Sequence, residues 1–196
     1  MIRIFVLSLL IASALVGWGQ QMPLGPIKVE PSGGKEKPIV ISAAGIEHDP
    51  LPIVGHWSSA DICLTDISCF LSNWIEANSS GNLQHLVALR PLDEKNEFEH
   101  RISQNPNIVS LNADRFKNIK QWSLIGWVEY GPFEIVLLVK QDEKLVMSAY
   151  ALPLIRAGEN WAQTDALSND PGVNAILDRI ANAVMQRHRP KPKSAK

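Results

Sequence analysis

WSLIGWVEYGPFEIVLLVKQDEKLVMSAYALPLIRAGENWAQTD, residues 122–165, is the stretch that decides the fold class. Its apolar runs are separated by short intervals at 131–132, 141–144 and 157–160, which are polar or contain glycine. Such intervals suit hairpins and are too short for the crossover connections that parallel strands need. The stretch therefore predicts three or four antiparallel strands in sequence, with the strand after Phe133 apolar on both faces near its middle.

Helical patterns precede these strands. Thr65 or Asp66 can cap a helix that runs to about Ala77, because apolar residues recur at helical spacing after them. A short second helix begins at Asn82, and the charged run 93–103 predicts a third, partly exposed helix. The apolar stripe of the first helix consists of Ile67, Phe70, Leu71, Trp74 and Ile75.

One more helix follows the strands. Asp170 is a favoured N-cap residue, and Pro171 occupies the first helical position, where proline is well tolerated. Helices that come first and an antiparallel meander that comes later indicate an α+β fold. We expect N-terminal helices packed on a curved antiparallel sheet, with an extra C-terminal helix.

The first nineteen residues predict an exported protein. Arg3 precedes an apolar run at 4–16, and Gly17 and Gly19 lie where a signal peptidase prefers small residues. The run is shorter than the roughly 18 residues that span a bilayer, so we expect no transmembrane segment. We predict cleavage near Gly19 and a periplasmic or secreted mature chain, with a retained anchor as the alternative.

Composition divides the remainder of the chain. Residues 20–56 are rich in proline and glycine and predict a flexible arm, in which 39–41 could form one short edge strand. A single α+β domain is expected at 57–186, followed by a basic, disordered tail at 187–196. The net charge of −1 gives no indication of a nucleic-acid-binding protein.

The chain has two cysteines, Cys63 and Cys69. An exported protein with an even number of cysteines is first interpreted as disulfide-bonded, so we predict a bridge between them. Two free buried thiols are the alternative. Neither the cysteines nor the scattered histidines have the spacing of a metal site, and the sequence indicates no metal and no cofactor.

Three stretches resemble a known family: FLSNWIEANSSGNLQHLVAL, VEYGPFEIVLLV and PLIRAGENWAQTDALSNDP. Together they resemble the NTF2-like superfamily, the cystatin-like α+β cone, in its small exported form. In that family the last strands typically have a polar turn with glycine, then a tryptophan and then a threonine. Gly158, Trp161 and Thr164 match this order. The resemblance covers about 58–170 and implies a sheet that curves around a long helix and leaves a pocket at the wide end. The proline-rich arm and the last helix lie outside it.

Some members of that superfamily are isomerases or dehydratases with an Asp or His base in the pocket. Here the candidate binding residues are His85, Trp122, Trp127, Glu129 and Tyr150. His85 and Glu129 could form an acid–base pair only if they converge on a substrate. Trp122 and Trp127 are five positions apart, so a regular strand places them on opposite faces, one of them at a dimer interface. No residue is assigned a catalytic role.

These observations favour non-catalytic binding of a small apolar ligand or a protein partner. A pocket acid–base enzyme and a structural homodimer are the alternatives. A fold alone does not decide among them, because one fold supports many functions.

Overall fold

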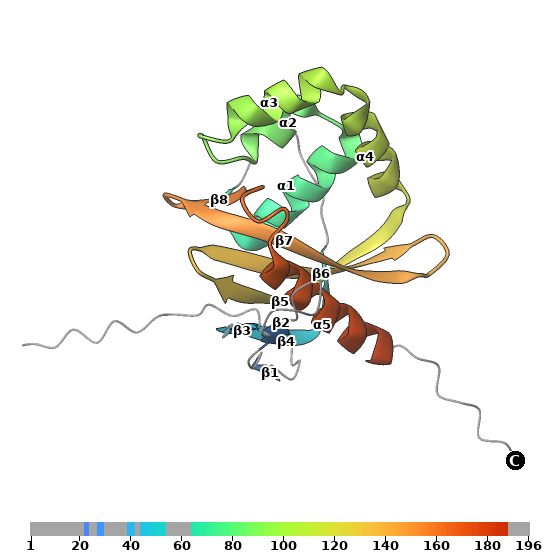
Figure 1. Ribbon diagram of the computed structural model, residues 1–196. Coiled ribbons are helices and arrows are strands. Elements are labelled where there is room, and N and C mark those ends of the chain that lie inside the picture. Colours follow the sequence, from blue (N-terminus) through green and yellow to red (C-terminus); the bar gives the residue numbers. More distant parts are fainter. Residues whose placement is uncertain (1–21, 24–26, 30–38, 42–43, 54–63, 188–196) are drawn as a thin grey trace, which may run out of the picture.

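The computed structural model describes residues 22–23, 27–29, 39–41, 44–53 and 64–187. The chain has an α+β fold in which helices pack on both faces of an antiparallel sheet (Figure 1). The helices are α1 (Ile67–Ser80), α2 (Leu83–Ala88), α3 (Lys95–Gln104), α4 (Asn107–Lys117) and α5 (Pro171–Arg187). None of the helices in these ranges is long and apolar enough to cross a membrane. Residues 1–19, the predicted signal peptide, lie outside the described residues.

The predicted meander is confirmed. Its four strands follow one another in both sequence and space, and each pairs antiparallel with the next. They are β5 (Ile119–Tyr130), β6 (Phe133–Asp142), β7 (Met147–Ala157) and β8 (Asn160–Gln163). β4 (Ala44–Pro52) and β1 (Met22–Pro23) extend the sheet beyond β5, so the sheet is open rather than closed into a barrel.

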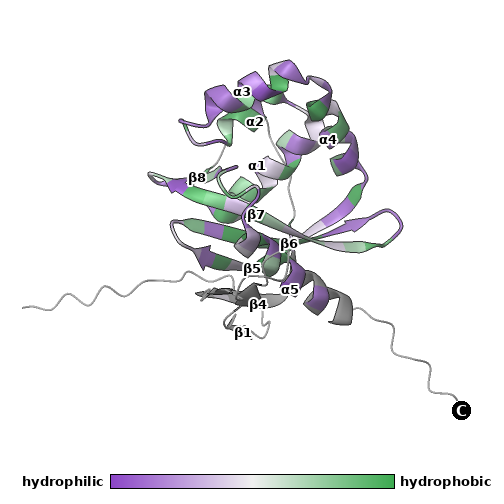
Figure 2. Cartoon of the chain, viewed as in Figure 1, coloured by the Kyte–Doolittle hydropathy of each residue, from purple (hydrophilic) through white to green (hydrophobic). Residues whose placement is uncertain are grey.

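The sheet separates two hydrophobic cores (Figures 1 and 2). The first four helices cover one face, and α5 covers the other. Alternate residues of β6 therefore enter different cores: Val136 and Leu138 pack beneath α1–α4, whereas Ile135 and Leu137 pack with α5. This arrangement explains why β6 is apolar on both sides.

The helix ends largely follow the predicted capping residues. The side chain of Asp66 accepts a hydrogen bond from the Cys69 amide at the start of α1. Asn82 caps α2 in the same way, and Asp170 accepts from the first amides of α5. The helix α4, which has no side-chain cap and exposes Leu111, was not predicted.

A bulge in β5 decides which face Trp127 occupies. The pairing of β5 with β6 shifts around Ile125, so that Trp122 lies opposite Lys140 and Trp127 lies opposite Val136. Opposed residues share a face, and Lys140 and Val136 share a face because they are four positions apart. The predicted split of the two tryptophans is therefore wrong: an extra residue reverses the alternation and returns both to the side of α1–α4.

Residues 44–52 form a strand where the sequence predicted a flexible arm. Ile53 donates its amide hydrogen to the Trp122 carbonyl at 2.9 Å, and alternate residues of a strand direct their amides to opposite neighbours. Pro52 therefore directs its missing N–H away from β5, so that no bond to this neighbour is lost. The short strand expected at 39–41 is confirmed as β3 (Ile39–Ile41), which pairs with β2 (Ile27–Val29) in a separate two-stranded sheet. The strand at 44–52 was not predicted.

Gly81 ends α1 in a left-handed conformation and allows α4 to approach closely. Its φ is 68°, and its amide donates to the Ala77 carbonyl at 3.1 Å. A Cβ at this position would lie 3.3 Å from the Cβ of Ala113 and 3.4 Å from Cγ1 of Val109. Both features favour glycine here.

We predict that Gly81→Ala lowers the free energy of unfolding by about 2 kcal/mol, of which about half comes from the positive φ and half from the contact with α4. Gly158→Ala is the matched control, because Gly158 has φ 67° and nothing within 4 Å of an added Cβ. It should cost about 1 kcal/mol. Urea denaturation of both variants measures the difference, and equal losses would contradict the close packing of α4 on α1.

Candidate functional site: a cavity between the helices and the sheet

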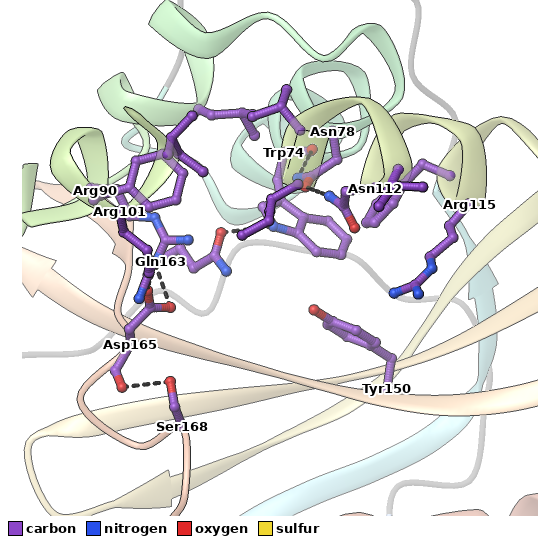
Figure 3. Close-up of a pocket in the computed structure, with 17 residues that line it drawn as sticks. Trp74, Asn78, Arg90, Arg101, Asn112, Arg115, Tyr150, Gln163, Asp165 and Ser168 are labelled. Carbon is purple, nitrogen blue, oxygen red and sulfur yellow. Dashed lines mark hydrogen bonds and ion pairs between the residues drawn. The ribbon is translucent and has the colours of Figure 1, made fainter. Parts of the chain in front are cut away.

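A cavity of about 500 Å³ lies between the helical layer and the end of the sheet formed by β7 and β8 (Figure 3). Its volume falls in the range of sites that hold small molecules. Aromatic and aliphatic side chains alternate around it with polar ones. The described residues that line it are Trp74, Asn78, Leu86, Arg90, Phe98, Arg101, Ile102, Ile108, Val109, Leu111, Asn112, Arg115, Phe116, Tyr150, Gln163, Asp165 and Ser168.

Trp74 forms the inner wall. Its ring centroid lies 5.1 Å from that of Phe116, 5.2 Å from that of Trp122 and 5.5 Å from that of Tyr150. The indole Nε1 donates a hydrogen bond to Oε1 of Gln163 at 3.0 Å. Edge-to-face aromatic contacts and a satisfied indole N–H fix a buried tryptophan in one orientation. The wall of the cavity is therefore preformed.

Asp165 closes one end of the cavity by binding two arginines. Arg90 Nη1 lies 2.6 Å from Asp165 Oδ1, and Arg101 Nη2 binds the other carboxylate oxygen. Phe98 lies beneath both guanidinium groups, with its ring centroid 4.4 Å from Cζ of Arg90. Burial acts to raise the pKa of Asp165, but the hydrogen bonds and charges of the two arginines outweigh it. The pKa of Asp165 therefore lies below its ordinary value.

Glu94 holds the backbone around Asp165 in place. One of its carboxylate oxygens accepts a hydrogen bond from the Thr164 hydroxyl, and the other accepts from the Asp165 amide at 3.0 Å. The Gln163 amide donates to the Leu89 carbonyl at 2.8 Å. These bonds connect the end of β8 to the helices α2 and α3, so the sheet and the helical layer are joined directly at this end of the cavity.

Two asparagines connect α1 to α4 at the top of the cavity. Asn112 donates to the side-chain oxygen of Asn78 at 2.6 Å, and Asn78 in turn donates to the Trp74 carbonyl at 2.7 Å. These amides are satisfied by each other and by the backbone, so their contribution is first to position α4.

Tyr150 and Arg115 differ from the other polar residues of the lining. Within the described part of the chain, the Tyr150 hydroxyl makes no hydrogen bond and Arg115 makes no ion pair. Burial raises the pKa of Tyr150, and the nearby Arg90 lowers it less than burial and Asp165 together raise it. The phenol therefore stays protonated near neutral pH and can donate a hydrogen bond.

Tyr150 is the one residue among the five sequence candidates that lines the cavity. Trp122 lies directly behind it, with ring centroids 5.7 Å apart. His85 and Glu129 are absent from the lining, and Glu129 is exposed on β5. Trp127 is partly buried and also lies outside the lining. The structure therefore does not bring His85 and Glu129 together in this cavity.

Sequence reasoning missed the arginines and Asp165. Arg90, Arg101 and Arg115 come from the loop after α2, from α3 and from α4, and Asp165 follows β8. No short motif joins residues so far apart. The one available signal was three arginines in a helical region that faces an open sheet, and this pattern is common on protein surfaces.

The described residues do not test the predicted disulfide between Cys63 and Cys69. Cys63 lies outside the described residues, and no disulfide forms within them. The Cys69 sulfur accepts a long hydrogen bond of 3.9 Å from Asn73. In the described ranges, no three His, Cys, Asp or Glu side chains gather as they would around a metal ion.

Comparisons with models of protein families, with curated proteins and with solved structures found no match. They do not identify the chain as a member of the NTF2-like superfamily, and that resemblance stays a prediction.

We predict that Asp165→Asn lowers the free energy of unfolding at pH 7 by about 2 kcal/mol, because it leaves the buried charge of Arg90 without its counter-ion. The control is Asp114→Asn. Asp114 forms an exposed pair with Lys117 at 3.9 Å, and its loss should cost less than about 0.5 kcal/mol.

The stability difference between the parent chain and Asp165→Asn should become smaller as pH falls. Since the folded-state pKa of Asp165 is lowered, its stabilisation is present above the unfolded pKa of about 3.9 and is lost as pH falls through the folded value. Denaturation between pH 7 and pH 2 should show the two proteins converging at low pH. A constant difference across this range would contradict the ion-pair account.

Proposed function

We propose that this domain binds a small molecule without covalent chemistry in the cavity between its helices and its sheet. The observation that carries the proposal is the Tyr150 hydroxyl, a partly buried hydrogen-bonding group that faces the cavity without a partner in the described residues. An unsatisfied polar group in a partly apolar site is costly unless water or a ligand binds it.

The lining suits a ligand with both apolar and polar parts. The rings of Trp74, Phe116 and Tyr150 provide flat apolar contact on one side. Arginine, asparagine and hydroxyl groups provide hydrogen bonds at the margins. Small-molecule sites commonly combine a mostly apolar wall with a few placed polar groups.

Binding is favoured over acid–base catalysis by the protonation of the lining residues. Asp165 is the one carboxylate among the described lining residues, and its lowered pKa makes it a poor proton acceptor near neutral pH. The raised pKa of Tyr150 disfavours the phenolate that a base would require. Neither pKa is shifted towards neutral pH, where a general base works best.

We further propose that the domain is an exported member of the NTF2-like superfamily. Support comes from the sequence resemblance, from the leader pattern at 1–19 and from the placement of a cavity between a long helix and an antiparallel sheet. A cavity in this position is what the resemblance implies.

The test uses two bicyclic probes of nearly the same shape, naphthalene-2-carboxylate and naphthalene-2-carboxamide, titrated by calorimetry into the full mature chain. We expect at least one of them to bind with one site per chain. Tyr150→Phe should weaken binding about fivefold, because it removes one hydrogen bond to the ligand. It should change the free energy of unfolding by less than about 0.5 kcal/mol, since that hydroxyl has no protein partner among the described residues.

Tyr130→Phe is the matched control. The Tyr130 hydroxyl donates to Asp170 at 2.9 Å on the opposite face of the sheet. This variant should lose about 1 kcal/mol of stability and bind the probes as the parent does. The proposal would be contradicted if neither probe binds, or if Tyr150→Phe binds as tightly as the parent chain.

A further inference from the structure

We propose that the ligand of this cavity is an organic anion, with an apolar or aromatic body and one carboxylate-type or phosphate-type group, and that Arg115 binds the anionic group. This inference rests on the proposed binding function and specifies the chemistry of its ligand.

The lining of the cavity carries excess positive charge. Three arginines and one aspartate are the charged residues among the described residues that line the cavity, an excess of two positive charges. Glu94 lies just outside the lining and binds the Asp165 amide, and it reduces the excess to one when it is included. A partly enclosed site with excess positive charge attracts anions.

The positive charge is distributed unevenly over the cavity. Figure 3 shows Arg90 and Arg101 gathered with Asp165 at one end of the cavity, whereas Arg115 extends from α4 towards the other end. Asp165 and Glu94 together carry two negative charges and compensate the first two arginines. The excess positive charge is therefore concentrated at Arg115.

The polar neighbours of Arg115 on α4 bind other residues. Asp114, the next residue in the chain, pairs with Lys117 on the exposed side of α4. Asn112 is bound to Asn78 and does not accept from Arg115. Among the described residues, no partner engages the guanidinium of Arg115, so its N–H donors can bind water or a ligand, and its planar shape suits a carboxylate or phosphate group.

Residues beside Arg115 can contact the rest of the ligand. Figure 3 shows Tyr150 reaching up from β7 beneath Trp74, near the end of the cavity that Arg115 approaches from above. The neutral phenol can donate a second hydrogen bond to an oxyanion that Arg115 holds. The rings of Trp74 and Phe116 then contact the apolar body. A purely apolar ligand would leave both polar groups without partners.

The experiment compares the two naphthalene probes, which differ chiefly in charge, on the full mature chain. The parent protein should bind the carboxylate at least about tenfold more tightly than the carboxamide. Arg115→Gln should weaken carboxylate binding about tenfold, the usual value of one charged hydrogen-bonding contact, and leave carboxamide binding within about twofold. Lys117→Gln, on the same helix but outside the lining, should change neither affinity.

Thermal unfolding should show Arg115→Gln to be as stable as the parent, because Arg115 is exposed and has no ion pair within the described residues. Binding changes in this variant therefore report on the site and not on folding.

Three other outcomes would each overturn a different part of the proposal. If both probes bind equally and depend on Tyr150, the anion inference is overturned and the proposed binding function stands. If the preference for the carboxylate persists in Arg115→Gln, the assignment of Arg115 is overturned. If neither probe binds, the proposed function fails, and this inference fails with it.

Discussion

The packing of Trp74 is the constraint on which the rest of the structure depends. Its side chain is 1% exposed, and its ring touches aromatic rings carried by α4, β5 and β7. Its indole nitrogen binds Gln163 in β8. One side chain of α1 thus fixes the distance between the helical layer and three strands of the sheet. The cavity exists because this contact holds the layers together at one end and leaves them apart beside it.

Asp165 imposes the second constraint. It draws Arg90 and Arg101 towards the end of β8, and Glu94 secures the same segment through the backbone. The Arg90 side chain is 9% exposed, so its charge needs this partner. Two of the three lining arginines, Arg90 and Arg101, are therefore engaged in ion pairs that stabilise the fold. Arg115 has no ion pair within the described residues and is available to a ligand.

Most of the fold could be predicted from the sequence, because its signals are local. The meander was visible in the intervals between apolar runs, and Asp66, Asn82 and Asp170 marked three helix starts. Helix α4 was not predicted, and neither were two features of the sheet. The bulge around Ile125 reversed the alternation on which the placement of Trp127 depended. Pro50 and Pro52 concealed the strand β4. Pro52 interrupts no hydrogen bond to β5, and Pro50 lies where the pairing with β5 shifts register.

The candidate site was much less predictable. Tyr150 was identified from its place in an apolar strand, but the charged residues come from separate elements and meet only after folding. Arg90 and Asp165 are 75 positions apart, and no spacing rule links them. His85 and Glu129 attracted notice because their side chains can perform acid–base chemistry, and the fold places neither in the cavity lining. Residue type alone was a poor guide where tertiary packing selects the partners.

The most direct test of the central claim is a proton–nitrogen NMR titration that observes arginine Nε–H and tryptophan indole signals as naphthalene-2-carboxylate is added. The account predicts that the signals of Arg115 and Trp74 shift together and saturably, while that of Trp161, which packs beneath Arg156 outside the lining, stays in place. Shifts confined to Trp161, or a shift of Trp74 without Arg115, would contradict it.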